Sequence, residues 1–218
     1  MSAPSSASVA ALAASALFAS ACAVVPLETP EGAEDLPPAG YGTLRQDEIT
    51  VAMTVGDLQI KVTPLDESIV RLTAPDTYQR LHGIATANRP RALAESGATR
   101  LHLFLVSFFS DAEGTAFRPE EIHIVSRGVR LRPAVIVPIT PGWGQRRLEQ
   151  RETEVAVYGF PGPVDFNSDL TVAYGSLESN AWNGILRRIL AERARVRARA
   201  GSSPRGGQAS IPYLEILR

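Results

Sequence analysis

The sequence predicts a mainly β protein, an antiparallel β-sandwich of about seven strands with a short inserted helix and a C-terminal helix. Three observations support this fold class. Short segments alternate apolar with small or polar residues, which is typical of strands. Turn pairs such as Gly56-Asp57 separate these segments at hairpin spacing. Near the C-terminus, the apolar period changes to that of a helix.

The chain opens with an apolar run, residues 8–21, which is shorter than the roughly 20 residues of a membrane-spanning helix. It ends in Ala19-Ser20-Ala21, a pattern that signal peptidase accepts, and is followed by Cys22, the only cysteine. The segment 17–22 resembles the lipobox of bacterial lipoproteins. That resemblance implies a signal peptide and a mature chain that begins at Cys22, acylated (palmitate) on sulfur and anchored in a membrane. The alternatives are a signal cut to leave a free Cys22 thiol, and a hydrophobic helix of a cytosolic protein.

The segment after Cys22 is rich in proline and acidic residues, and residues 23–42 contain no basic residue. Such a composition buries too little apolar surface to fold, so we expect an extended tether. A single cysteine also excludes an intramolecular disulfide. The predicted parts of the chain are a signal peptide (1–21), a lipidated cysteine with a disordered tether (22–45), a β-sandwich domain with its C-terminal helix (46–200) and a flexible tail (201–218).

The first strands of the domain are residues 49–55 and 58–62, which form a hairpin because Gly56 accepts the positive φ of a tight turn. A short helix follows. Thr73 supplies a capping hydroxyl, Pro75 suits the first turn, and Asn88-Arg89-Pro90 ends the helix.

Residues 101–109 are almost continuously apolar, which indicates a central strand buried on both faces. The sequence then predicts strands at 121–125 and 129–131, joined by an Arg127-Gly128 turn, with 135–137 continuing the second one beyond Pro133. Residues 153–160 form the next strand. Residues 169–174 form the last.

The elements over residues 99–175 resemble, in order and spacing, the immunoglobulin-like (telokin-like) modules of secreted bacterial proteins. The resemblance rests on 117–120 entering one strand, Gly128 in a turn, 140–142 before a strand, and the strands 155–160 and 170–174. It implies a binding or assembly unit, and it carries over only the architecture.

The C-terminal helix begins near Asn180, with Ser179 as its cap, and the stretch 201–204 stops it. An apolar stripe runs along it, comprising Trp182, Ile185, Leu186, Ile189 and Leu190. The stripe either packs on the sandwich or docks on another protein. The arginine-rich end, 193–199, is either a solvated helix end or a contact for acidic lipid headgroups or an acidic partner.

Candidate binding residues lie in the loop around Trp143, which stands between two glycines and beside Arg146 and Arg147. An indole with guanidinium neighbours can stack a sugar or a peptide aromatic ring. The alternative is that Trp143 folds back over the edge of the sandwich. Trp182 is the other candidate.

No catalytic residue, metal ligand set or cofactor site is predicted. His82, His102 and His123 lack metal-binding spacings, although the latter two can approach one another across a sheet. No nucleophile elbow or phosphate-binding glycine motif occurs. Net charge is near zero, and nucleic acid is not an expected partner.

These observations favour a cell-envelope lipoprotein that binds or scaffolds another envelope component, a protein or a glycan, without catalysis. By resemblance, Ala23 after the cysteine makes the outer membrane the default location in a cell with two membranes. The alternatives are an envelope hydrolase with a loop-built site, and a structural subunit of a secretion or surface assembly.

Overall fold

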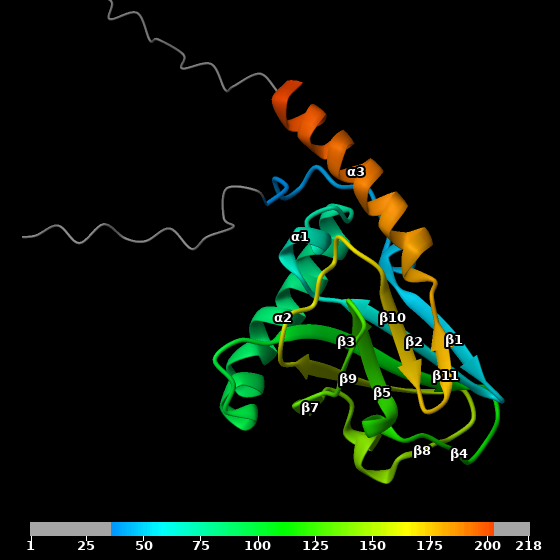
Figure 1. The fold of residues 1–218 in the computed structure, drawn as a ribbon. Coiled ribbons are helices and arrows are strands. Elements are labelled where there is room, and N and C mark those ends of the chain that lie inside the picture. Colours follow the sequence, from blue (N-terminus) through cyan, green and yellow to red (C-terminus); the bar gives the residue numbers. More distant parts are fainter. Residues whose placement is uncertain (1–35, 203–218) are drawn as a thin grey trace, which may run out of the picture. The chain divides into compact units, whose positions relative to one another are not determined.

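The computed structural model describes residues 36–202, whose fold is built on two antiparallel sheets (Figure 1). The larger has the strand order β1-β2-β3-β9-β7 and the smaller the order β11-β10-β5-β6, while β4 and β8 form a separate pair. The strands are β1 (Val51–Val55), β2 (Leu58–Pro64), β3 (His102–Ser110), β4 (Thr115–Ala116), β5 (Ile122–Ser126), β6 (Val129–Leu131), β7 (Val135–Pro138), β8 (Arg147–Leu148), β9 (Glu152–Phe160), β10 (Leu170–Tyr174) and β11 (Leu177–Ser179).

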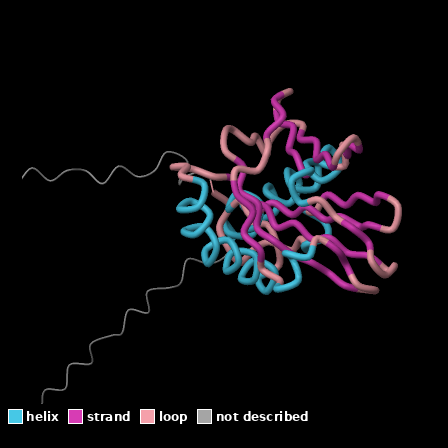
Figure 2. Tube along the Cα trace, turned by 90° about the horizontal axis from the view of Figure 1, so that it is seen from below, coloured by secondary structure: helices cyan, strands magenta, loops and turns pink. Residues whose placement is uncertain are grey.

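Three α-helices accompany the sheets. They are α1 (Glu67–Val70), α2 (Pro75–Ser96) and α3 (Trp182–Ser202), and the short 3-10 turns are η2 (Gln46–Ile49), η3 (Pro119–Glu121) and η4 (Pro141–Gln145). Helix α2 packs on β7 and β9, whereas α3 contacts η2 and β10; Figure 2 shows the helices in cyan and the strands in magenta. None of the helices within residues 36–202 is long and apolar enough to cross a bilayer.

The mainly antiparallel β fold with a C-terminal helix is confirmed, but the described chain has eleven strands where about seven were predicted. The four additional strands are short: β4 and β8 have two residues each, β11 has three, and β7, predicted as a continuation of the strand before it, has four. Alternation cannot be recognised over two or three residues, so sequence patterning overlooks such strands.

The predicted hairpin is confirmed. Val55 pairs with Leu58 across the turn, and Gly56 has a φ of 57°. The central position of residues 101–109 is confirmed as well, since β3 is the third of five strands and pairs with both β2 and β9. Its inner face is buried, as at Phe104, whereas its outer face is buried at Leu103 and Leu105 and only half-buried at Ser107 and Phe109.

The expectation that 135–137 continue the strand before Pro133 is wrong. β6 belongs to the smaller sheet, whereas β7 pairs with β9 in the larger one. Gly159 on β9 permits the change of sheet, because Val135 and Leu101 occupy the space where a Cβ would stand. The Ala134 amide also donates to the Gly159 carbonyl.

The inserted helix α2 is longer than expected. It has 22 residues and runs through Pro90 to Ser96, where Gly97 closes it with a φ of 66°. The residue before its first turn is Ala74, and Thr73 does not cap it. Instead, the Thr73 hydroxyl donates to the Val70 carbonyl at 2.6 Å and is buried. Packing of α2 on β7 and β9 outweighs the helix-breaking tendency of Pro90.

The predicted signal segment 1–21, Cys22 and all but the first two residues of the predicted tail 201–218 lie outside the described residues. Residues 201–202 belong to α3, so the helix runs past its predicted end at Gly201. The end of the predicted tether does lie within the described residues, and it is folded. Leu44 is buried, its amide donates to the Leu72 carbonyl at 3.1 Å, and its carbonyl accepts from Ala74 at 2.9 Å. The folded domain therefore begins before residue 46.

The core lies between the two large sheets. Phe104 and Phe108 point into it from β3, and Phe108 meets Tyr174 of the smaller sheet with ring centroids 6.0 Å apart. Trp182 of α3 closes one end by packing on Phe166 at 5.9 Å. The inner face of the larger sheet is thus fully used, and only its outer face is available to contact a ligand.

Candidate functional site

The outer face of the larger sheet is covered only in part. β3 sends alternate side chains to this face, among them Leu105 and Ser107. Helix α2 lies over β7 and β9 on this side. Toward β1 and β2 the face stays open, and a groove forms between the helix and the open strands.

The groove has a volume of about 630 Å³ and a mixed lining. Leu105 and Val155 form an apolar floor, and Ile84 of α2 and Ile139 after β7 form apolar walls. Ile139 is 44% exposed, so its side chain is accessible to a ligand in the groove. Lys61 and Arg80 stand at the mouth.

Register explains how residues far apart in sequence come to line the floor. Ala52 pairs with Lys61, Lys61 with Ser107, and Ser107 with Val155, so that one row crosses four strands. All four residues line the groove. They are small, polar or only half-buried, in contrast to the large apolar side chains on the inner face of the same strands.

The mouth of the groove is cationic, and one of its two positive side chains, Arg80, is held in place by a hydrogen bond. Arg80 donates to the Gln46 side chain at 2.7 Å, which holds the guanidinium over the groove. Asp47, the acidic residue at the rim, is paired with Arg45 at 3.1 Å. Within residues 36–202, Lys61 has no ion-pair partner, so its charge is available to a ligand.

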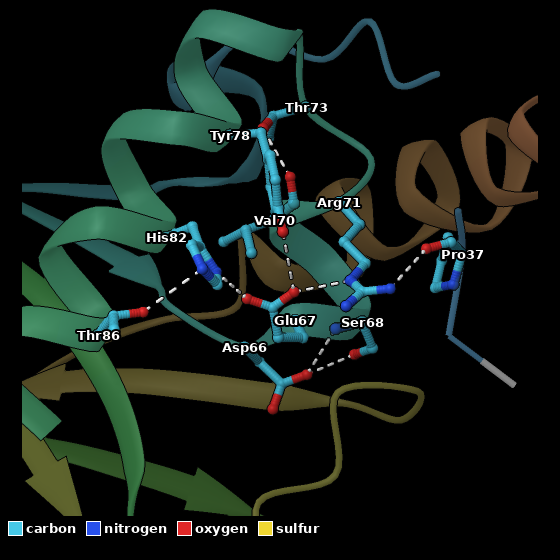
Figure 3. A network of polar contacts seen from close by, with 10 residues as sticks. All are labelled: Pro37, Asp66, Glu67, Ser68, Val70, Arg71, Thr73, Tyr78, His82 and Thr86. Atoms are coloured by element: carbon cyan, nitrogen blue, oxygen red, sulfur yellow. Dashed lines mark hydrogen bonds and ion pairs between the residues drawn. The ribbon is translucent and has the colours of Figure 1, made fainter. Parts of the chain in front are cut away.

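A polar network joins α1 to α2 nearby (Figure 3). The Glu67 carboxylate accepts from Arg71 Nε at 2.7 Å and contacts His82 Nδ1 at 2.6 Å, while the Tyr78 hydroxyl lies 3.5 Å away. The rings of Tyr78 and His82 stack with centroids 5.2 Å apart. Burial acts to raise the pKa of Glu67, but the hydrogen bonds from Arg71 and His82 outweigh it and lower that pKa.

Glu67, His82 and Thr86 bring a carboxylate, an imidazole and a hydroxyl together in series, as in some hydrolases. The Thr86 oxygen lies 3.5 Å from His82 Nε2, at the outer limit of a hydrogen bond. None of the three lines the groove. The contacts instead fix α1, α2 and, through Arg71, the Pro37 carbonyl relative to one another.

The other two histidines lie in different sheets, His102 on β3 and His123 on β5, so they do not meet across one sheet as expected. Burial lowers the pKa of His102, which packs on Phe166. His123 Nδ1 contacts the Glu121 carbonyl at 2.8 Å. Across the part of the chain that the structure describes, no group of three His, Cys, Asp or Glu residues is placed to hold a metal ion.

The predicted binding residues around η4 are not gathered into one exposed site. Trp143 is 7% exposed and packs on Phe117 with ring centroids 5.3 Å apart. Arg146 and Arg147 are exposed, the former paired with Glu120 at 2.5 Å and the latter donating to the Gly114 carbonyl at 3.0 Å. The indole of Trp143 therefore serves the core.

Trp182, the other candidate, is 1% exposed, and its Nε1 donates to the Ser168 carbonyl at 3.1 Å. The α3 stripe packs inward at Ile185 and Ile189, which are buried, whereas Leu190 is 47% exposed. Of the two interpretations of the stripe, packing on the β domain therefore holds for Ile185 and Ile189.

Sequence reasoning missed the groove. The one feature of the sequence that indicates the groove is Ser107, a polar residue within the apolar run of β3. Lys61 and Val155 are assigned to the same row only once the pairing register is known. Comparison with known proteins finds no matching protein family, no matching curated protein and no matching solved structure.

Proposed function

We propose that this chain is a lipid-anchored protein of the bacterial cell envelope, and that its β domain binds an extended segment of another envelope protein without catalysis. The observation that carries the binding role is the groove on the outer face of the larger sheet. Its volume of about 630 Å³ lies within the range of sites that hold small ligands or a few side chains. The expected location rests on the lipobox-like segment that ends at Cys22.

A peptide suits the groove better than a glycan. Sugar sites use exposed aromatic rings, and no aromatic residue lines this groove. Leu105, Val155 and Ile139 offer aliphatic surface, while Lys61 and Arg80 stand at the mouth. This arrangement favours a segment that has an aliphatic side chain next to a carboxylate.

We further propose that the domain is an immunoglobulin-like sandwich. Two antiparallel sheets bury their inner faces against each other through pairs such as Phe108 and Tyr174. The edge strands β1 and β11 are in contact, which supports a face-to-face arrangement. Modules of this architecture act as binding or assembly units.

Site-specific cross-linking in intact cells tests the binding role. A photoreactive side chain at Ile139, on the groove wall, is compared with one at Val129, an exposed position on β6. We expect a discrete protein adduct from position 139 alone. Lys61→Glu should weaken that adduct about tenfold, because it reverses the charge at the mouth. Equal adducts at both positions, or an adduct insensitive to Lys61→Glu, contradict the proposal.

The anchor has an independent test, mass spectrometry of the mature N-terminus. The expected species begins at Cys22 and carries acyl groups. An unmodified Cys22 at the N-terminus, or an intact Met1, refutes lipidation while leaving the groove proposal in place.

A further inference from the structure

Helix α3 concentrates positive charge. It contains a single acidic residue, Glu192, and six arginines, which are Arg187, Arg188, Arg193, Arg195, Arg197 and Arg199. Its net charge is therefore +5 (six minus one), whereas the whole chain carries −1. A field of this kind on one element of a near-neutral protein points to an anionic partner.

Glu192 is turned inward and offsets only part of this charge, through ion pairs with Arg195 at 3.5 Å and Arg199 at 2.8 Å. Its side chain is 1% exposed and accepts from the Thr43 hydroxyl at 2.8 Å and from Arg199 at 2.8 Å. These contacts oppose the effect of burial, which raises the carboxyl pKa, and the net result is a lowered pKa. The carboxylate thus belongs to the packing of α3 on the N-terminal segment.

The exposed side of α3 carries arginines and an apolar side chain. Arg187 and Arg188 are exposed, and neither has an ion-pair partner within residues 36–202. Together with Arg195 they line a shallow groove of about 400 Å³ between α3 and η2. Leu190 is 47% exposed on the same helix. Arginines beside an exposed aliphatic residue are the composition of a surface that meets lipid headgroups.

The folded chain begins along this helix. The Tyr41 carbonyl accepts from Arg199 at 2.6 Å, and the Thr43 amide donates to Glu192 at 3.1 Å. Figure 1 shows the start of the described chain, in blue, beside the orange and red part of α3. Thirteen residues, 23–35, separate Cys22 from Leu36 and can span at most about 45 Å.

We propose that the exposed face of α3 rests on anionic phospholipid headgroups and orients the domain on its membrane. The proposal takes its location from the lipid anchor proposed above. A membrane is favoured over an acidic protein because the arginines lie on the helix along which the anchored end of the chain enters the domain. Guanidinium groups bind phosphate in a bidentate manner, which makes them effective at such a surface.

Vesicle sedimentation tests the lipid contact without the anchor. The chain from residue 22 onward, with Cys22→Ser, is mixed with vesicles of phosphatidylcholine alone or with added phosphatidylglycerol. The test variant combines Arg187→Gln, Arg188→Gln and Arg195→Gln. The control variant removes equal charge from exposed positions outside α3, namely Arg100→Gln, Arg132→Gln and Arg151→Gln.

We expect binding only to vesicles with phosphatidylglycerol, weakening as salt is raised. The α3 variant should bind roughly 100-fold more weakly, since each arginine near an anionic surface contributes about a factor of five. The control variant should stay within about threefold of the parent, since the charges it loses lie outside the contact.

Three results overturn the proposal: no binding to anionic vesicles at low salt, equal binding to both kinds of vesicle, or equal losses in the two variants. Arginine-dependent capture of an acidic envelope protein in the absence of vesicle binding overturns it too. Because Cys22 is absent from the assay, a failure here is distinct from a failure of lipidation, which the mature N-terminus reports separately.

Discussion

The charged side chain of Glu192 is buried, and the side chains beside it compensate its negative charge. The carboxylate contacts Thr43, Arg195 and Arg199, so the N-terminal segment and α3 share one buried charge. The sequence does not reveal this role, because Glu192 reads as one polar residue in a charged helix. Its partner Thr43 lies 149 residues away, within the predicted tether.

Replacing Glu192 by Gln should lower the free energy of unfolding by roughly 1.5–3 kcal/mol, because a nearly isosteric amide keeps the shape but loses charged hydrogen bonds. Chemical denaturation measures the change. The matched control is Glu178→Gln, which removes an exposed pair with Arg130 and should cost less than about 1 kcal/mol. Similar losses in both variants would contradict a buried role for Glu192.

Gly42 is another residue whose close neighbours could not be predicted from the sequence. A Cβ at this position would stand 2.1 Å from the backbone carbon of Leu72. We expect Gly42→Ala to lower the free energy of unfolding by about 1–3 kcal/mol through overpacking. Gly184→Ala is the control, since its Cβ meets nothing within 4 Å, and it should stabilise α3 by about 0.5–1 kcal/mol. Thermal unfolding of both variants tests the contrast.

At the scale of elements, strands with a full alternating pattern were predictable and elements decided by tertiary packing were not. The β1–β2 hairpin follows from its own residues. By contrast, β7 changes sheets because Gly159 leaves room for Val135, and no local pattern reports that. The groove has the same origin, since a row of single residues from four strands lines it.

Helix α2 gives a direct test of packing against propensity. Pro90 lies inside the helix and lacks the amide that a helix interior requires. Pro90→Ala should therefore raise the free energy of unfolding by about 1–3 kcal/mol. Pro75→Ala is the control, because proline is favoured in the first turn and its loss should bring no gain. Denaturant midpoints compare the two, and a loss of stability in Pro90→Ala would show that the proline is needed where it is.

For the molecule as a whole, the lowered carboxyl pKa values of Glu67 and Glu192 couple stability to pH. A carboxyl whose pKa is lower in the folded state stabilises the fold above its unfolded pKa of about 4.5 and loses that contribution as pH falls through the folded value. Burial also lowers the pKa of His102 in the folded state, so its contribution is lost as pH falls below the unfolded value of about 6.5. We therefore expect the free energy of unfolding to begin to fall below about pH 6.5 and to fall further below about pH 4.5, where the two glutamates are protonated.

Denaturant titrations between neutral and acidic pH measure this profile. The Glu192→Gln variant should show a shallower decline than the parent, because one of the linked carboxyls is gone. Parallel profiles for the two proteins would show that Glu192 does not contribute to the pH dependence of stability.

The contacts of residues 41–44 bear on how the domain would carry tension from the anchor proposed at Cys22. A protein held at one end by a lipid is pulled through the first residues of its folded part. Here residues 41–44 are bound on two sides. Leu44 pairs with Leu72 and Ala74 near α1, while Thr43 binds Glu192 and Tyr41 binds Arg199 of α3. Traction on the anchor proposed at Cys22 would thereby be shared between the start and the end of the described chain before it reaches the sheets. The fold is clamped at the point where the proposed anchor would load the chain.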